Sequence, residues 1–344
     1  MLVLAGIAGL APAAQPAMAE AVVVSGTSDG YDNSVYYLGN DDTGTDSNNT
    51  LTINSGTFVG AAGGSSVSTF SEGMDDSSEN TDTAAVSGNS LIINDPSDTY
   101  QERDWAAGGV AINKDVTGNT VTVNYSTTAT EDHIYNNIDD DIIGGSTITG
   151  SASDNKTYIN GVKYNEDNSF WASPYYVYGG YSYIGPVSGN EVHLNGGFIN
   201  NNVAAGAQGN ADGSTTTDVM DTYLSDYAES LSFTKTGDVT NNKTYVDGAY
   251  VVGTVYGGYM YVPASSDGAI VQPGSITGNT VDVSNSANIY SVYGGYGYYT
   301  NAGNSPISMT DNTVTIKDSI VGDGHVAGGY AETGLYGTGS GQRQ

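Results

Sequence analysis

The acidic side chains are the groups in this sequence that cluster in a way that could do chemistry. Three aspartates occupy positions 139–141, and Glu-Asp-Asn occupies positions 166–168. Hard cations such as Ca²⁺ prefer clustered oxygen ligands of this kind. Neither run has the ligand spacing and central glycine of a twelve-residue calcium loop. Solvated acidic loops are therefore favoured over calcium sites, and we predict neither a metal nor a cofactor.

Catalytic residues are equally hard to assemble from this sequence. An enzyme acting on acidic polysaccharides needs carboxylates beside arginine or lysine, but Arg103 is the only arginine before the C-terminal tail and the lysines are scattered. His133 and His193 have no partner at a meaningful spacing, and no Gly-x-Ser-x-Gly element supplies a serine nucleophile. We expect no catalytic residue and a protein that is not an enzyme. A carbohydrate-active β-helix of the polysaccharide lyase or hydrolase kind is kept as the alternative.

The elements that would carry these side chains follow from a two-part phrase that returns eight times. Its first part, Asn-x-apolar-x-apolar, is seen in TGNTVTV at 117–123, and its second, apolar-Tyr/Ala-Gly-Gly, in VYGGY at 255–259. The repeated asparagines are 30 to 52 residues apart, and a period of that length built from strands and turns indicates a solenoid. We predict an all-β fold, a right-handed single-stranded parallel β-helix (β-solenoid) with loop insertions. Two copies, at 155–161 and 242–248, share Asn-Lys-Thr-Tyr and resemble a duplicated cassette.

Strand parity assigns a role to the repeated asparagine. Alternate residues of a strand face the same way, so Asn119, Val121 and Val123 share one face. A buried carboxamide without a partner is costly, by about 1–3 kcal/mol, whereas stacked copies can donate the amide of one to the carbonyl of the next. A glycine before the asparagine, as at Gly118, permits the positive φ of a corner. The first copy is anchored at Asn49, and the predicted structural ladder comprises Asn89, Asn119, Asn155, Asn190, Asn242, Asn279 and Asn312.

The Gly-Gly phrase has two interpretations. In the first, the glycines make a tight corner and the tyrosines stack as an outer ladder. In the second, the tyrosines form an exposed stripe that contacts sugar rings or a host protein, since aromatic faces suit both partners. The candidate ligand-contact stripe consists of Tyr178, Tyr181, Tyr183, Tyr256, Tyr259, Tyr261, Tyr293, Tyr296 and Tyr298.

Composition limits the possible partners. The 344 residues include no cysteine, and 38 acidic side chains against 8 basic ones give a net charge of −30. Nucleic acids and anionic lipid surfaces both require a basic footprint, so we expect neither as a partner. Such a surface is instead well solvated and self-repelling.

The chain divides into four predicted parts. Residues 1–19 contain a short apolar run and an Ala-x-Ala pattern, which indicates a secretory signal peptide, although a buried strand is the alternative because no basic residue precedes the run. Residues 20–46 are expected to form a cap or linker and 47–330 the repeat array, with the longest insertion, 210–238, thrown out of the stack as a loop or short helix. Residues 331–344 are expected to be a tail that looks severed and leaves strand edges open.

These features together resemble the passenger region of bacterial autotransporters, the adhesins of type V secretion. The resemblance covers roughly residues 51–330 and rests on the signal-like start, the absence of cysteine and the repeated TGNTVxV and VYGGY phrases. It implies export and display at the surface of a Gram-negative cell. Members of the family end in a translocating β-barrel, and nothing after Tyr330 has the alternation of such strands.

The resemblance implies a passenger-type adhesin, an outer-membrane-associated or secreted protein that presents loops and a tyrosine-bearing face. The implied partners are host-cell, matrix or glycan ligands and other bacterial cells, with the membrane contacted only through the missing barrel. A passive surface spacer is a further alternative.

Overall fold

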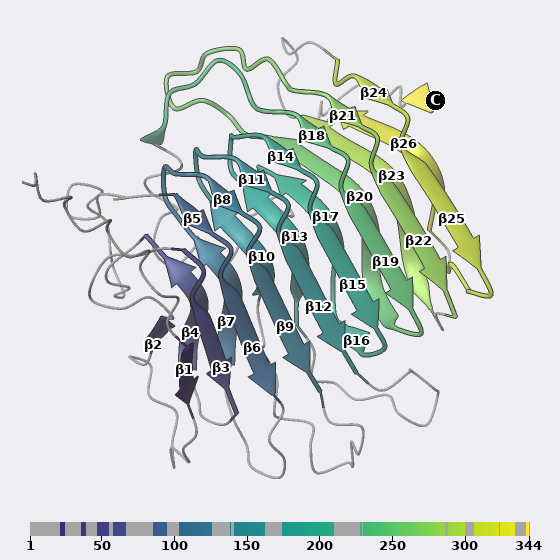
Figure 1. Ribbon diagram of the computed structural model, residues 1–344. Coiled ribbons are helices and arrows are strands. Elements are labelled where there is room, and N and C mark those ends of the chain that lie inside the picture. The colour runs from purple at the N-terminus through teal and green to yellow at the C-terminus, as the bar shows by residue number, and fades with distance from the viewer. Residues whose placement is uncertain are drawn as a thin grey trace, which may run out of the picture.

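A computed structural model shows the protein as a parallel β-helix (Figure 1). The structure describes residues 21–24, 36–38, 47–54, 58–66, 85–94, 103–125, 138, 141–161, 174–209, 228, 230–285, 288–299, 306–322, 324–333 and 342–343. The signal peptide predicted at 1–19 and the acidic run at 166–168 lie outside these residues, as do Asp139, Asp140, His133 and most of the insertion at 210–238. Asp141, which was expected in a solvated loop, is instead buried at the start of the strand Asp141–Thr147, so that prediction is wrong for this residue.

Three long sheets run along the rod, and most of the described coils contribute one strand to each. Sheet A consists of β1 (Ala21–Val24), β3 (Thr50–Ile53), β6 (Ser90–Asn94), β9 (Thr120–Asn124), β12 (Lys156–Asn160), β15 (Glu191–Asn195), β19 (Lys243–Asp247), β22 (Thr280–Ser284) and β25 (Thr313–Lys317). Sheet C consists of β5 (Val86–Ser87), β8 (Val116–Thr117), β11 (Ala152–Ser153), β14 (Val187–Ser188), β18 (Val239–Thr240), β21 (Ile276–Thr277) and β24 (Met309–Thr310).

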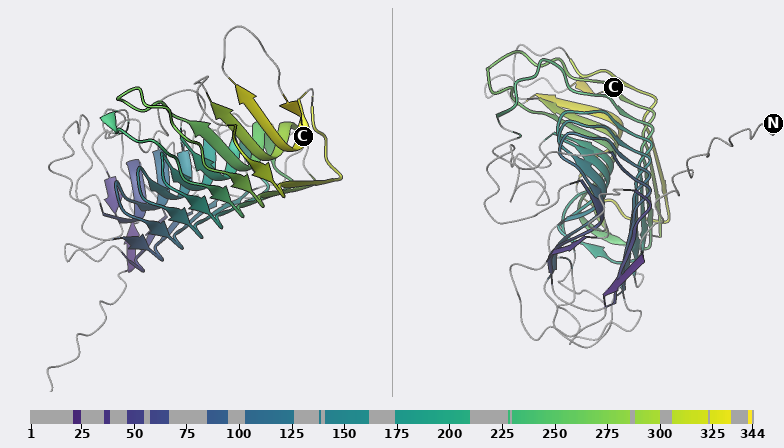
Figure 2. Two further views of the ribbon diagram at one scale, coloured as in Figure 1. Left: turned by 90° about the horizontal axis from the view of Figure 1, so that it is seen from above. Right: turned by 60° about the vertical axis from the view of Figure 1, so that its left-hand side comes forward.

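Sheet B carries the Gly-Gly phrases. It consists of β2 (Tyr36–Leu38), β4 (Phe58–Ser65), β7 (Arg103–Val110), β10 (Asp141–Thr147), β13 (Tyr176–Ser182), β17 (Val203–Gln208), β20 (Tyr250–Val262), β23 (Ile289–Tyr299), β26 (Val326–Thr333) and two short strands, β16 (Phe198–Ile199) and β27 (Gln342–Arg343). All described strand pairs are parallel except β26 with β27. The two views of Figure 2 show the strands of successive coils stacked into a rod. The predicted β-helix is therefore confirmed.

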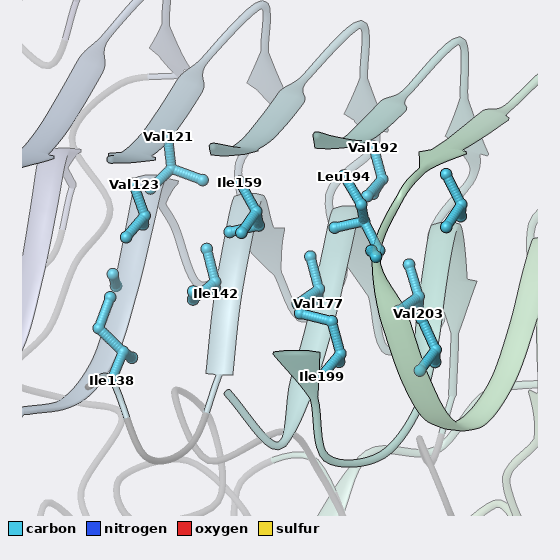
Figure 3. Close-up of a cluster of buried hydrophobic side chains, with 14 of the residues drawn as sticks. Val121, Val123, Ile138, Ile142, Ile159, Val177, Val192, Leu194, Ile199 and Val203 are labelled. Carbon is cyan, nitrogen blue, oxygen red and sulfur yellow. The ribbon is translucent and has the colours of Figure 1, made fainter. Parts of the chain in front are cut away.

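The core fills the space between sheet B and the other two sheets. Val121 and Val123 of β9 point toward Ile142 of β10 and belong to one apolar cluster between sheets A and B (Figure 3). A second cluster, which includes Val116 and Met260, lies between sheet C and the C-terminal ends of the sheet B strands. Alternate residues of the sheet A strands are buried, which is the period-two pattern that the parity argument predicted.

The asparagine ladder lies at the junction between sheets C and A and is fully satisfied. Asn155 donates its Nδ2 to Asn190 Oδ1 at 3.0 Å and to the carbonyl oxygen of Val116 at 3.0 Å. Its own Oδ1 accepts from the backbone nitrogen and from the Nδ2 of Asn119, each at 3.0 Å. The same donation to the next copy recurs at every step from Asn89 to Asn312. These hydrogen bonds form the ladder that strand parity predicted, and each amide donates to the copy that follows it in the chain.

The kink before each asparagine has a positive φ, as predicted for the glycines. Gly118 has φ of 65°, and the equivalent positions that lack glycine carry Asn or Asp, for example Asp154 with φ of 55°. Asn and Asp tolerate this left-handed conformation better than other side chains do. The short link between sheets C and A therefore has the same geometry in coils with and without glycine.

The Gly-Gly pairs lie directly opposite the asparagine ladder. A Cβ atom on Gly180 would lie 2.4 Å from the carboxamide of Asn190, and one on Gly179 would lie 2.5 Å from the carbonyl oxygen of Ala205. The second glycine of the phrase therefore makes room for the asparagine, and the first lets neighbouring backbones approach. The two halves of the repeated phrase are one packing unit.

Both ends of the array differ in detail from the prediction. β1 pairs with β3 and β2 pairs with β4, so the stretch expected to be a cap or linker contributes strands to the first coil. At the other end β26 continues to Thr333, and β27 pairs with it in antiparallel fashion. The expected boundary at 330 is therefore too early, because strand pairing continues past it.

Candidate binding face

The predicted tyrosine stripe lies on the outer face of sheet B, and most of it is not exposed. Tyr178, Tyr181, Tyr183, Tyr256, Tyr259 and Tyr293 are buried, whereas Tyr261, Tyr296 and Tyr298 are partly buried. Part of the covering comes from the end of the 210–238 insertion, where Ala228 is buried in the same cluster and Phe233 lies edge-on to Tyr183 with centroids 6.4 Å apart. An exposed stripe is therefore wrong for six of the nine residues. The described end of the insertion packs on the sheet and is not thrown out.

The tyrosine rings also stack on one another. Tyr259 stacks on Tyr296 with centroids 5.7 Å apart and planes 2° apart, and Tyr261 stacks on Tyr298 at 4.9 Å. Burial raises the pKa of Tyr178 well above its ordinary value, and burial also raises the pKa of Tyr256. These side chains therefore stay neutral. The arrangement is the structural ladder of the first interpretation, and ring faces engaged in it are closed to a ligand.

The outward side chains of the described sheet A strands, by contrast, are partly or fully exposed. These side chains form three columns along the rod, each with one residue per coil. The first column is Thr50, Ser90, Thr120, Lys156, Glu191, Lys243, Thr280 and Thr313. The second column is Thr52, Ile92, Thr122, Tyr158, His193, Tyr245, Asp282 and Thr315. The third column is Asn54, Asn94, Asn124, Asn160, Asn195, Asp247, Ser284 and Lys317.

An aromatic stack occupies the middle of this face. The ring of His193 lies between those of Tyr158 and Tyr245, with centroid distances of 4.8 and 4.6 Å and interplanar angles of 17° and 21°. All three side chains are partly exposed. His193, which the sequence argument treated as an ordinary surface residue, is the centre of the stack because three consecutive strands place these residues in register.

A charged group beside the stack fixes its position. Glu191 Oε2 lies 2.9 Å from His193 Nε2 and 3.2 Å from Lys156 Nζ. The hydrogen bond with Glu191 raises the pKa of Lys156. Partial burial acts to raise the pKa of Glu191, but hydrogen bonds from His193 and Lys156 outweigh it, and the pKa lies below its ordinary value. Glu191 therefore stays ionised and holds the imidazole between the two phenol rings.

The third column is a second asparagine ladder, which the sequence argument missed. Asn94, Asn124, Asn160 and Asn195 each donate an Nδ2 hydrogen to the Oδ1 of the preceding copy at 2.8–3.0 Å. Unlike the inner ladder, it lies at the surface. The signal was available in the sequence, because each of these asparagines lies five residues after an inner asparagine.

Sheet C adds a column of hydroxyl groups to the same outer surface. The outward residue of each of its seven strands is a serine or threonine, namely Ser87, Thr117, Ser153, Ser188, Thr240, Thr277 and Thr310, and Ser47 pairs with Ser87 through an isolated bridge. Neighbouring hydroxyl groups are 2.9 Å apart at Ser47 and Ser87 and 3.1 Å apart at Thr117 and Ser153. We call the outward surface of sheets A and C the polar face. Many of its asparagine, serine and threonine side chains are hydrogen-bonded to their neighbours in the next coil, and each column has one residue per coil.

Neither a metal centre nor a membrane span is found in the described part of the chain. Among those residues no group of three or more His, Asp or Glu side chains is placed to hold a metal ion. The same residues contain no helix with the length and hydrophobicity needed to cross a membrane. Comparison with known proteins yields no match to a protein-family model, a curated protein or a solved structure.

Proposed function

We propose that this protein is an exported, surface-displayed rod that binds other surfaces through its polar face, as a passenger-type adhesin would. One observation carries the proposal: the polar face presents the same kinds of hydrogen-bonding side chain in coil after coil, with an aromatic stack at its centre. A surface of this kind suits a repetitive ligand, because many weak contacts along one rod add up through avidity.

The electrostatics of the chain agree with this role. A net charge of −30 keeps copies of the rod apart and keeps the rod soluble. It also disfavours polyanionic partners, so the groups contacted on the bound surface are neutral or basic. We infer that the ligands are host-cell, matrix or glycan structures or the surface of other bacteria, and that the protein is displayed on a Gram-negative cell.

The test is adhesion of beads coated with the full chain to epithelial cells, to mucin and to bacterial biofilm. Coated beads are expected to bind at least one of these surfaces more strongly than albumin-coated beads do. If beads coated with the full chain bind no more strongly than albumin-coated beads on all three surfaces, the proposal is contradicted and a passive spacer is favoured.

A variant locates the binding face. Replacing Tyr158, His193 and Tyr245 with threonine, the residue that the same column carries at Thr122 and Thr315, removes the stack without altering the strand pattern. Adhesion is expected to fall several-fold. A matched triple alanine variant of Ser153, Ser188 and Thr240 in sheet C should weaken adhesion less. If the threonine variant adheres like the wild type, the aromatic stack has no part in binding.

A further inference from the structure

Two aromatic rings on the polar face, those of Tyr158 and Tyr245, each keep one free face. In a stack of three rings only the two outer faces are open, and His193 covers one side of both Tyr158 and Tyr245. Beyond Tyr245, the residue in register in the next coil is Asp282, an exposed and much shorter side chain. Beside the free face of Tyr245 the surface therefore drops to β22, the strand that carries Asp282. We call this drop in the surface the step.

Two charged groups border this step without being paired. Lys243 lies two residues before Tyr245 on the same outward face of β19, and its side chain is exposed. Lys243 and Asp282 make no ion pair with each other or with any other described residue, whereas Lys156 at the far end of the stack is bound to Glu191. The step at Tyr245 thus offers an aromatic face, a cationic donor and an anionic acceptor. A second carboxylate, Asp247, lies beside it and already accepts from Ser284 and Asn285.

We propose that the step formed by Tyr245, Asp282 and Lys243 is a binding subsite for a single neutral pyranose ring of a glycan. The apolar face of a pyranose would lie on the Tyr245 ring, its hydroxyl groups would donate to Asp282, and Lys243 would donate to a ring or hydroxyl oxygen. The inference rests on the proposed binding function and specifies its ligand class.

The net charge decides between classes of sugar. Polyuronates carry one negative charge per residue and would approach a chain with a net charge of −30, which one unpaired lysine cannot offset. A neutral sugar meets no such barrier and satisfies both charged groups with its hydroxyl groups. The outer asparagine ladder ends at Asn195, and Asp247 and Ser284 continue its column beside the step, so a longer glycan can lie along this polar column.

The test is ligand-detected NMR with the full chain and three soluble hexasaccharides: one of β-1,4-linked glucose, one of β-1,4-linked N-acetylglucosamine and one of galacturonate. We expect saturation transfer to at least one neutral hexasaccharide, with a Kd on the order of 1 mM, as befits a single weak subsite. Binding of the galacturonate hexamer is expected to be weaker. Absence of binding by both neutral sugars, or tighter binding of galacturonate, would overturn the proposal.

Two variants test the position. Tyr245→Ala removes the ring and is expected to weaken binding at least about tenfold. Asp282→Ile covers the ring face with an aliphatic side chain that the same column already carries at Ile92, so the fold should tolerate it and binding should again fall about tenfold or more. Wild-type affinity in Asp282→Ile would overturn the proposal.

The chain also offers a matched control. Thr122→Ile covers the free face of Tyr158, at the other end of the stack, in the same way. It should leave the affinity unchanged, and an equal loss in this variant would contradict the assignment to Tyr245. Beads of Asp282→Ile separate the two proposals. If the Asp282→Ile beads lose sugar binding but still adhere, adhesion does not depend on this subsite. If the wild-type chain adheres but binds no neutral sugar, the subsite proposal is overturned and the proposed adhesion is not.

Discussion

Removing one rung of the inner ladder should be among the most destabilising single changes in the protein. In Asn190→Ala, the backbone N–H and one amide N–H of Asn155 lose the Oδ1 acceptor at 3.0 Å, and the carbonyl oxygen of Ala152 loses a donor at 2.9 Å. All of these groups are buried. A buried polar group left unsatisfied costs about 1–3 kcal/mol, so two orphaned donors and a weakened acceptor add up to about 3–5 kcal/mol.

The control is the outer ladder. Asn195 donates to Asn160 Oδ1 at 3.0 Å, but at the surface water can replace this bond. Asn195→Ala should therefore change the free energy of unfolding by only about 0.5 kcal/mol. The two variants remove the same side chain from the same coil, one just before β15 and one at its last residue, and differ mainly in burial.

The assay is urea unfolding followed by circular dichroism, with amide hydrogen exchange to localise the effect. Exchange is needed because a repeat array can lose its cooperativity, so that one coil opens before the others. Asn190→Ala should raise exchange rates first in β12, β15 and β19. If it costs less than about 1 kcal/mol, or no more than Asn195→Ala, then the ladder does not hold the coils together as argued.

Three further results are expected. Gly258→Ala would place a Cβ 2.7 Å from the carboxamide of Asn279, and urea unfolding should show a loss of about 1–3 kcal/mol. Thr157→Val removes the 2.6 Å hydrogen bond from Oγ1 to the carbonyl oxygen of Tyr178, and the same assay should show a loss of about 1–2 kcal/mol, whereas no loss would mean that this carbonyl is otherwise satisfied. Burial raises the pKa of Tyr178 and Tyr256 above the ordinary 10.0. The stabilisation that these neutral phenols give to the folded state is therefore complete below pH 10.0, and it is lost as the pH rises toward their pKa values in the folded chain. Tyrosinate absorbance should therefore rise together with unfolding, and ionisation of every tyrosine near pH 10.0 in a folded chain would contradict their burial.

Much of the fold could be predicted from the sequence, because stacking makes local pattern and tertiary contact coincide. Asn119, Val121 and Val123 alternate with threonines, and in a parallel β-helix that alternation alone separates core from surface. The ladder followed from the same parity, since an inward carboxamide needs a partner and a further copy of itself is the partner that a solenoid supplies.

The candidate face could not be predicted in the same way. The tyrosines after Gly-Gly drew attention because they are numerous, but burial depends on what packs over sheet B, and the segment that includes Phe233 is far away in sequence. Tyr158 and Tyr245 are the tyrosines of the two Asn-Lys-Thr-Tyr copies, but His193 belongs to neither copy, and insertions of different length separate the three residues. Only the register of three strands shows that they stack.

The sequence by itself determined the period, the strand parity, the inner asparagine ladder and the charge, because each depends on residue identity at a regular spacing. The tertiary structure alone decided which glycine faces which asparagine, which outward side chains remain exposed and which rings keep a free face. Those features depend on how coils of unequal length align side by side, and the hydrogen bonds between neighbouring strands set that alignment.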